Sequence, residues 1–422
     1  MGDVTLTPGT SGSYCRPVAM PQDPDPAPLA GSPQVAAWIA RLGAAPQALT
    51  TPGAGDVSHA AMIDAVRALR HQATLSPTHT HAVLGALRDQ LDWGRIDVAQ
   101  VWMLLAELSH RTGRSLDALR CWHQASQRAA QGLDAGSLEA LGLPDPSHWA
   151  KRVTAMSELR AEYLQDAYSE IRRGHEPKAL FRIDRALAGY LGKASVFSSH
   201  PTQRPKLMFI PGLRTGGFLD PSSHPLVSPL LAAFEDMRRE FRGALAAGDG
   251  IEPFLGASPT ATSGEYVSGP AGASWDALFF FRHGRRYDDN HARFPRTGAL
   301  LDAMDLCRID GQAPEICFSI LRPHTRIEPH HGVTNARVVI HIPFQVPPGC
   351  YLELTNVGRH HWREGEPLVF DDTFEHAATN PSSHPRGILL MDAWHPELTP
   401  PERAAFRALI EAITRMEALP EH

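Results

Sequence analysis

The chain has 422 residues, a length that favours two or three domains over one compact unit. Hydrophobic residues make up 43% of the chain and charged residues 20%, and the formal net charge of -6 offers no basic surface to nucleic acid. No segment has the length and apolar character of a membrane span. These values exclude a nucleic-acid partner and predict a globular protein without a membrane span.

The cysteines are too few and too scattered for a disulfide framework or a thiolate zinc site. They are odd in number and never spaced as C-x-x-C: Cys15, Cys121, Cys307, Cys317 and Cys350. The N-terminus also lacks the basic start and apolar core of a signal peptide. Together these features predict a cytoplasmic protein.

The N-terminal half divides into a leader and a helical part. Residues 1–32 are rich in Pro, Gly, Ser and Asp, which predicts a flexible leader, and residues 33–196 carry apolar residues at helical spacing. Large and small residues fall on the positions of a tetratricopeptide-like helix pair at Trp102, Leu105, Ala106, Gly113, Ala118, Trp122 and Ala125. A weaker echo begins at Tyr163, which does not fit a regular tandem spacing of about 34 residues. A plain helical bundle remains the alternative.

Residues 197–422 change to short β-rich runs separated by Pro and Gly turns. The predicted strands are "KLMFIPGL", "DALFFFRHG", "EICFSILRP", "ARVVIHIPFQV", "CYLELTNV", "PLVFDD" and "RGILLMDAW". A helix is expected from about residue 225 to 246, and another closes the chain, with Thr399 as its N-cap and Pro400 as its first residue. The predicted fold class is therefore α+β and multidomain: an all-α, tetratricopeptide-like domain followed by a jelly roll, or double-stranded β-helix.

The segment "ARVVIHIPF" separates polar from apolar side chains. The strand period of two places Arg337, Val339 and His341 on one face and an apolar row on the other. If the apolar row packs against the second sheet or flanking helices, the Arg and His face points into the barrel. A buried cation there needs an anion, which a dicarboxylate ligand would supply.

Two further histidines flank this strand. His330 precedes it and His376 follows a later strand and turn, and imidazole nitrogens from separate strands suit Fe, Zn or Cu. An iron site with a carboxylate would place Asp or Glu two residues after the first histidine, where this chain has Gly332. Spacing alone leaves metal binding open.

Residues 205–405 resemble the aspartyl/asparaginyl β-hydroxylases, which are Fe(II)- and 2-oxoglutarate-dependent oxygenases. The resemblance is carried in order by "FIPGLR", "SWDALFFFRHGRR", "FSILRPHTRIEPHHGVTNARVVIHI", "FDDTFEHAATNPSSHPR" and "DAWHPELTP". It implies that His330 and His376 are the metal ligands and the catalytic centre. Because this family keeps glycine where other such oxygenases keep the carboxylate, Gly332 agrees with the resemblance.

The resemblance also implies a cosubstrate site. Ser319 and Arg386 match the residues that hold the distal carboxylate of 2-oxoglutarate, which suits a hydroxyl beside a guanidinium fork. His341 matches the strand histidine near the cosubstrate. The partner arginine two residues earlier is replaced by Val339, and Arg337 on the same face is predicted to compensate.

The remaining candidates have structural interpretations. His331 points away from His330 in an extended chain; His360 and His361 are expected in a surface turn, and His395 is expected to serve packing and hydrogen bonding. An Asp pair that opens a turn commonly caps backbone amides, and this role is preferred for Asp371 and Asp372 over metal ligation.

The resemblance implies a dioxygenase that uses Fe(II), 2-oxoglutarate and O2 and hydroxylates the β-carbon of an Asp or Asn residue in a peptide or protein. A lipid acyl chain or a small-molecule natural product is the alternative substrate. A catalytically silent interaction protein and a hydrolytic metal barrel are the alternatives from other classes.

Overall fold

The chain divides into two compact units, described here from a computed structural model. The structure describes residues 99–111, 113–129, 146–214, 216–255 and 266–419. One unit comprises Met1–Glu162 with Arg415–His422, and the other comprises Tyr163–Thr414. This division lies earlier in the chain than the predicted boundary at residue 196. The predicted leader, residues 1–32, and the predicted helices up to residue 98 lie outside the described residues.

The first unit is helical where it is described. It contains α4 (Ala99–Arg111), α5 (Ser115–Ala129) and most of α7 (Pro146–Asp166). Gly113 joins α4 to α5 with a φ of 78°, a left-handed conformation that favours glycine. Trp102 and Ala118, one on each helix, are buried. The predicted helix pair is therefore present, and the tetratricopeptide-like repeat stays a prediction.

The second unit opens with α8 (Ser169–Arg173), η2 (Pro177–Leu180) and α9 (Phe181–Tyr190) and closes with the start of α15 (Pro400–Glu417). As predicted, α15 begins at Pro400 and Thr399 precedes it. Both the backbone N–H and the hydroxyl of Thr399 donate to Glu402, at 3.0 and 2.9 Å. Arg182 of α9 also donates to both carboxylate oxygens of Glu402, at 2.6 and 2.5 Å, which joins α9 to the start of α15.

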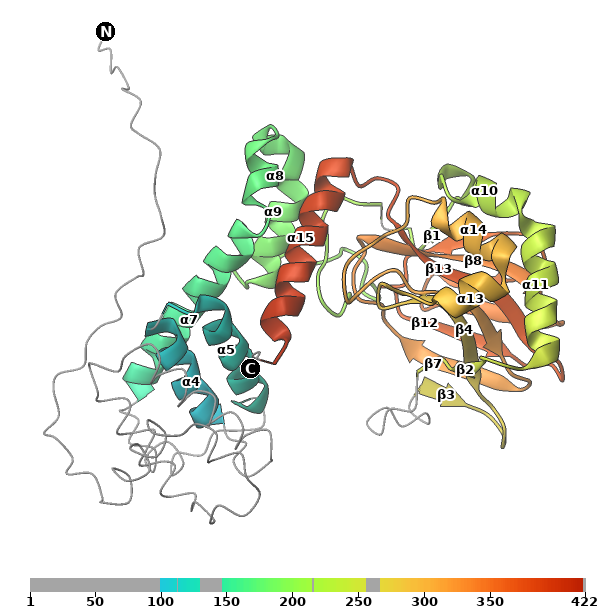
Figure 1. Cartoon of the computed structure of the whole chain (residues 1–422), viewed down its shortest axis with the longest axis horizontal. Helices are drawn as coiled ribbons and strands as arrows, with labels where there is room; N and C mark the ends of the chain where they lie inside the picture. Colours follow the sequence, from blue (N-terminus) through green and yellow to red (C-terminus); the bar gives the residue numbers. More distant parts are fainter. Residues whose placement is uncertain (1–98, 112, 130–145, 215, 256–265, 420–422) are drawn as a thin grey trace, which may run out of the picture. The chain divides into compact units, whose positions relative to one another are not determined.

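Two antiparallel sheets follow (Figure 1). The larger contains, in spatial order, β1 (Phe218–Leu219), β11 (Leu368–Phe370), β8 (Arg337–Gln345), β13 (Arg386–Trp394), β6 (Ile316–Leu321), β4 (Trp275–Arg282) and β2 (Glu252–Pro253), with β5 (Arg285–Arg286) beside β4. The smaller contains β10 (Gly358–His361), β9 (Tyr351–Leu354), β12 (His376–Asn380), β7 (Thr325–His330) and β3 (Val267–Ser268). From β6 to β13 the chain passes back and forth between the sheets, as expected for a double-sheet jelly roll.

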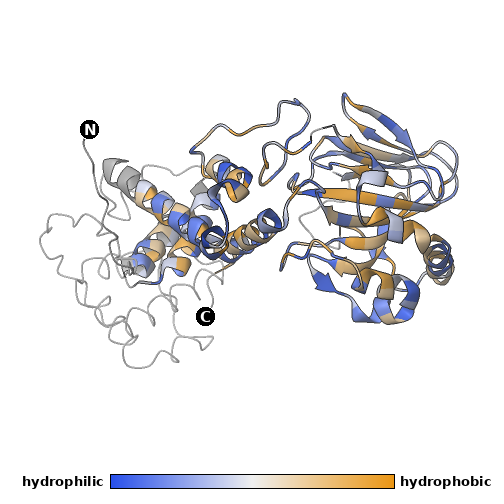
Figure 2. Ribbon diagram, turned by 90° about the horizontal axis from the view of Figure 1, so that it is seen from above, coloured by the Kyte–Doolittle hydropathy of each residue, from blue (hydrophilic) through white to orange (hydrophobic). Residues whose placement is uncertain are grey.

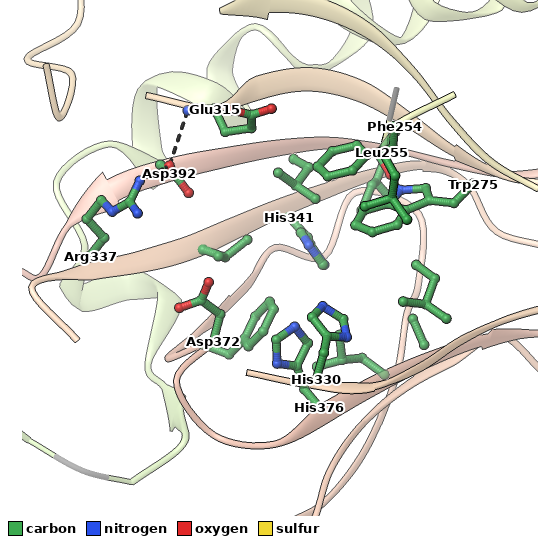
Figure 3. Close-up of a pocket in the computed structure, with 18 of the residues that line it drawn as sticks. Phe254, Leu255, Trp275, Glu315, His330, Arg337, His341, Asp372, His376 and Asp392 are labelled. Carbon is green, nitrogen blue, oxygen red and sulfur yellow. Dashed lines mark hydrogen bonds and ion pairs between the residues drawn. The ribbon is translucent and has the colours of Figure 1, made fainter. Parts of the chain in front are cut away.

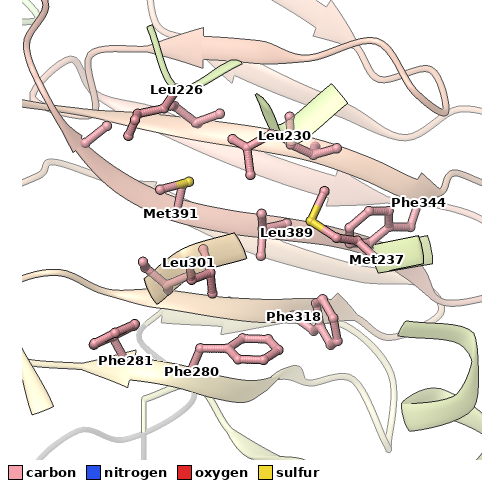
Figure 4. Packing of buried hydrophobic residues seen from close by; sticks show 14 of the residues in the cluster. Leu226, Leu230, Met237, Phe280, Phe281, Leu301, Phe318, Phe344, Leu389 and Met391 are labelled. Atoms are coloured by element: carbon pink, nitrogen blue, oxygen red, sulfur yellow. The ribbon is translucent and has the colours of Figure 1, made fainter. Parts of the chain in front are cut away.

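Helices cover the outer face of the larger sheet (Figure 1). They are α10 (Val227–Ala232), α11 (Phe234–Ala247), α13 (Asp288–Arg293) and α14 (Pro295–Asp302), with η3 (Pro221–Ser223) before them. The apolar row of β8 packs against Met237 and Phe241 of α11, and together they belong to one buried hydrophobic cluster (Figure 4). A Cβ on Gly387 of β13 would lie 1.9 Å from the Phe241 ring, so glycine is what lets α11 approach the sheet.

Hydrophobic and hydrophilic residues alternate along many of the strands and helices (Figure 2). The opposite face of β8, which bears Arg337 and His341, points between the two sheets. The predicted alternation along this strand is therefore confirmed, and it turns the polar face into the barrel.

One predicted strand is wrong. "KLMFIPGL" forms no strand; only Met208 makes an isolated bridge, with Thr334. The reason is visible at Ile210, whose backbone N–H and C=O both pair with the side-chain amide of Asn335, at 2.7 and 2.9 Å. A side chain takes the place of a neighbouring strand there.

Candidate active site

A cavity of about 460 Å³ lies between the two sheets of the second unit. The inner faces of β6, β8 and β13 form one wall, and β7 and β12 form the opposite wall. Figure 3 shows His330 and His376 on the smaller sheet facing His341 on the larger one. The three histidines that the sequence singled out are thus brought to one cavity.

His330 and His376 are direct neighbours across two strands. His330 ends β7 and His376 begins β12, the two are in register, and their ring centroids lie 4.1 Å apart. Each Nδ1 lies close to the backbone carbonyl two residues earlier, 2.8 Å from Glu328 O and 2.9 Å from Phe374 O. Because a carbonyl only accepts, each Nδ1 carries the proton and each Nε2 keeps a free lone pair.

Burial keeps both imidazoles neutral. It lowers the pKa of His376 to about 3, and it lowers the pKa of His330 although the Glu328 carbonyl opposes the shift. A neutral imidazole with its Nδ1–H fixed by a carbonyl is the form that binds a metal. The pair therefore fits a metal ion held by two histidines.

The carboxyl group of Asp372 lies so close to position 332 that only glycine fits there. The Gly332 N–H donates to Asp372 O at 2.6 Å, and a Cβ on Gly332 would lie 2.1 Å from Asp372 Cγ and 2.2 Å from both carboxyl oxygens. Asp372 thus fills the space that a side chain at position 332 would occupy. Burial, with the nearby charge of Asp392, raises the pKa of Asp372 to about 8.

Asp372 lies near the histidine pair but does not complete a cluster of three ligands. Within the described residues, no group of three His, Cys, Asp or Glu side chains is close enough to hold a metal ion together. The donor set offered is therefore two imidazoles. Asp371 caps its turn as predicted: its carboxylate accepts from the backbone N–H of Thr373 at 2.9 Å.

Arg386 and Ser319 form a site for an anion. Arg386 is 2% exposed, and its Nη1 lies 3.5 Å from both the hydroxyl and the carbonyl of Ser319, which are long contacts. Its guanidinium carbon lies 4.9 Å from the centre of the Trp362 ring, and its Nε has no partner among the described residues. Burial lowers the pKa of Arg386 to about 10, which leaves it protonated at neutral pH.

No carboxylate of the described residues pairs with Arg386, so this buried cation is uncompensated. Trp275 donates to the Ser319 hydroxyl at 3.0 Å and stacks on Phe254, with ring centroids 3.7 Å apart. The end of the cavity at Arg386 therefore suits a carboxylate.

His341 lies beside this anion site. It is buried, and neither ring nitrogen has a hydrogen-bond partner among the described residues. Its ring lies 5.9 Å from Trp362 and 5.2 Å from Phe370. Burial, with the charge of Arg386, holds its pKa well below the usual value, so the ring is a neutral donor and acceptor.

Arg337 lines the same cavity but already has a partner. Its Nη1 lies 2.5 Å from Asp392 Oδ2, an ion pair between neighbouring strands. Val339 lies between Arg337 and His341 on the inner face of β8. That Arg337 compensates for the missing arginine stays a prediction, and any such role would have to share the guanidinium with Asp392.

Residues 232–396 match the family model for aspartyl/asparaginyl beta-hydroxylase. These residues are thus similar to the aspartyl/asparaginyl beta-hydroxylases. The aspartyl/asparaginyl beta-hydroxylase of Mus musculus is 36% identical over 139 residues, 32% of this chain and 18% of that protein. The Mus musculus aspartate beta-hydroxylase domain-containing protein 2 is 28% identical over 289 residues, 67% of this chain and 80% of that protein.

The Homo sapiens aspartate beta-hydroxylase domain-containing protein 2 is 30% identical over 229 residues, 53% of this chain and 59% of that protein. The match to the mouse aspartyl/asparaginyl beta-hydroxylase thus covers less than a fifth of that protein's length. Among solved structures, a Pseudomonas putida prolyl-4-hydroxylase gives a TM-score of 0.26 at 14% identity over 42% of this chain and 92% of its own; this slight likeness supports no conclusion.

Other histidines of the second unit lie away from the pair formed by His330 and His376. His331 contacts the Thr373 carbonyl through Nδ1 at 3.0 Å and does not line the cavity. His395 is buried and accepts from the Glu397 N–H at 3.2 Å, a structural contact. The predicted turn at His360 and His361 is wrong, because both belong to β10, which pairs with β9.

Sequence reasoning missed Trp362, which stacks on Arg386 from beyond β10. The signal was the alternation of His360 and Trp362 along an extended segment, which places both on one side. Both have a buried ring nitrogen without a partner among the described residues.

Proposed function

We propose that the second unit is an Fe(II)- and 2-oxoglutarate-dependent dioxygenase that hydroxylates a peptide or protein. One observation carries this proposal: a single cavity holds two neutral imidazoles with free Nε2 atoms and a buried guanidinium without a carboxylate partner among the described residues. A metal ion and a dicarboxylate would satisfy both.

The side chains have separate tasks in this proposal. The Nε2 atoms of His330 and His376 would hold Fe(II), and their Nδ1–H bonds to backbone carbonyls fix the rings. Arg386 and Ser319 would bind the distal carboxylate of 2-oxoglutarate, which removes the unmatched charge. His341 borders the cosubstrate from the larger sheet, and the apolar lining excludes water.

When bound, Fe(II) supplies the oxidising chemistry: O2 is consumed, 2-oxoglutarate becomes succinate and CO2, and one oxygen atom enters the substrate. The names of the relatives favour the β-carbon of an Asp or Asn residue as the position of hydroxylation. A lipid acyl chain or a small molecule is the alternative substrate.

We also propose a cellular location for the protein. Cys307, Cys317 and Cys350 are buried and form no disulfide among the described residues, which supports a reducing, cytoplasmic location. No helix within the described ranges combines the length and apolarity needed to cross a membrane.

Anaerobic titration tests the site directly. We expect Fe(II) and 2-oxoglutarate together to produce a visible charge-transfer absorption band that is absent with either alone and absent from His376→Ala. His331→Ala is the matched control and should keep the band. The absence of a band in the unmodified protein would leave a catalytically silent interaction protein, and turnover without O2 and 2-oxoglutarate would indicate a hydrolase.

Substrate class requires a second measurement. Peptides that contain Asp or Asn, acyl lipids and small molecules are incubated with Fe(II), 2-oxoglutarate and O2, and a gain of one oxygen in mass is compared with succinate formed. If the gain of one oxygen accompanies succinate formation only with lipids or small molecules, the proposal of a peptide or protein substrate is contradicted.

A further inference from the structure

Two buried arginines line the same cavity, and their surroundings differ. Arg337 pairs with Asp392, with Nη1 and Oδ2 2.5 Å apart. Arg386 has no carboxylate partner in the part of the chain that the structure describes, and its guanidinium carbon lies 4.9 Å from the centre of the Trp362 ring. One guanidinium is thus paired with an acid, and the other lies over the face of an indole.

These two arrangements leave different donors free. A carboxylate accepts N–H bonds, so Arg337 has already used part of its donor edge. An aromatic face attracts a cation through its π electrons and has no oxygen that accepts those N–H groups. Among the described residues the Nε of Arg386 has no partner, and its Nη1 makes only the two contacts of 3.5 Å to Ser319. The donors of Arg386 therefore remain open to a ligand.

Trp362 is held in place from both sides. It is 4% exposed and directly follows β10, where His361 pairs with Tyr351 of β9. Three residues after Trp362, the N–H of Gly365 donates to the carbonyl of Pro343 on β8 at 3.0 Å. The segment is therefore tied to the smaller sheet before the indole and to the larger sheet after it, which fixes the ring beside Arg386.

The ring face offsets part of the cost of burying the charge of Arg386. A cation–π contact is stronger away from water than at the surface, and both Trp362 and Arg386 are buried. Burial nevertheless lowers the pKa of Arg386 to about 10, so the indole alone does not balance the charge. A carboxylate ligand would supply the remainder.

We propose that Trp362 is the positioning residue of the anion site: its ring face holds the Arg386 guanidinium and leaves the N–H donors free for a carboxylate ligand. The inference rests on the proposed function, in which that ligand is the distal carboxylate of 2-oxoglutarate. Trp362 acts through Arg386, because an acid in its place would pair with the guanidinium and compete with the ligand.

Exchanges at position 362 test this role without turnover. Trp362→Phe keeps an aromatic face, and Trp362→Leu removes it. Each full-length variant is titrated calorimetrically with Zn(II) and, once loaded, with 2-oxoglutarate or succinate. We expect Trp362→Leu to weaken 2-oxoglutarate binding at least about tenfold and Trp362→Phe to weaken it less than about threefold. The Zn(II) affinity should stay unchanged in both variants, because His330 and His376 are not altered.

Nuclear magnetic resonance of the ligand-free chain measures the contact directly, because an N–H over an aromatic face resonates at lower frequency than one in water. The Nε–H signal of Arg386 is assigned by its loss in Arg386→Met. We expect it at low frequency in the unmodified chain and in Trp362→Phe, and shifted back in Trp362→Leu. Tyr351→Leu is the matched control: the Tyr351 ring lies 4.7 Å from the guanidinium carbon of Arg359 and does not line the cavity. It should change neither the Arg386 signal nor 2-oxoglutarate binding.

The outcomes separate the two proposals. Equal losses of Zn(II) and 2-oxoglutarate affinity in Trp362→Leu, or an unchanged 2-oxoglutarate affinity, would overturn the inference alone. An Arg386 signal that is not shifted in the unmodified chain would overturn it without any variant, even if Trp362→Leu does not fold. Succinate binding that Trp362→Leu weakens, in a chain that does not bind 2-oxoglutarate, would contradict the proposed function alone. Binding of neither dicarboxylate would overturn both.

Discussion

Position 332 has no room for a side chain, because the carboxyl group of Asp372 occupies the adjacent space. A methyl group there would lie about 2 Å from three atoms of the Asp372 carboxyl group, so the backbone or Asp372 would have to move. We expect Gly332→Ala to lower the free energy of unfolding by about 2 kcal/mol and to weaken Zn(II) binding, measured by denaturant titration and metal competition.

Gly243→Ala is the matched control, because Gly243 lies inside α11 with no atom within 4 Å of an added Cβ. The exchange should raise stability by about 1 kcal/mol. A Gly332→Ala protein as stable as the unmodified chain would mean that Asp372 does not occupy this space.

Arg386 places a buried charge where only a ligand compensates it. Replacing it with the uncharged Met should raise the free energy of unfolding of the ligand-free protein by about 1 kcal/mol and weaken 2-oxoglutarate binding at least about 100-fold. Calorimetry and thermal unfolding measure the two effects. Arg359→Met on the surface strand β10 should change neither; retained dicarboxylate binding in Arg386→Met would contradict the assigned anion site.

At the level of elements, α15 is held at its start by Glu402. Although burial, its largest influence, raises the pKa of Glu402, hydrogen bonds from Arg182 and Thr399 outweigh it and hold the pKa below the usual value. A carboxyl group with a lowered pKa in the folded state stabilises the protein above its unfolded pKa of about 4.3, and this stability is lost as the pH falls through the folded value.

Glu402→Gln should therefore cost about 2 kcal/mol at pH 7 and progressively less below about pH 4. Urea unfolding at a series of pH values gives the difference from the unmodified chain. Glu411→Gln, farther along α15, leaves the bridge from Arg182 intact and is the control. A cost that stays constant down to pH 3 would show that the charge of Glu402 does not contribute.

Local sequence patterns predicted several helices and strands, but they did not predict which side chains meet across different strands. The inward face of β8, with Arg337 and His341, followed from the strand period alone, and Pro400 marked the start of α15 because proline suits the first helical position. The pairing of Arg337 with Asp392 depends on the register between β8 and β13, which no local pattern contains. The same holds for Trp362, which reaches Arg386 from the segment that follows β10.

The whole molecule combines two units that each bury their own apolar residues. Leu119 of α5 is fully buried in the first unit, and Leu389 of β13 is fully buried in the second. We expect two thermal transitions, with Leu119→Ala lowering one and Leu389→Ala lowering the other, each by about 3 kcal/mol.

Ligands should distinguish the same transitions. Zn(II) with 2-oxoglutarate binds only the folded second unit in our proposal, so at 100 times the dissociation constant it adds about 2.7 kcal/mol to that transition. Scanning calorimetry of the full chain with and without the ligands measures the shift, and Arg386→Met should abolish the part due to 2-oxoglutarate. A single transition that both Leu→Ala exchanges lower equally would mean that the two units unfold as one, and a ligand shift in the first unit would place the site outside the jelly roll.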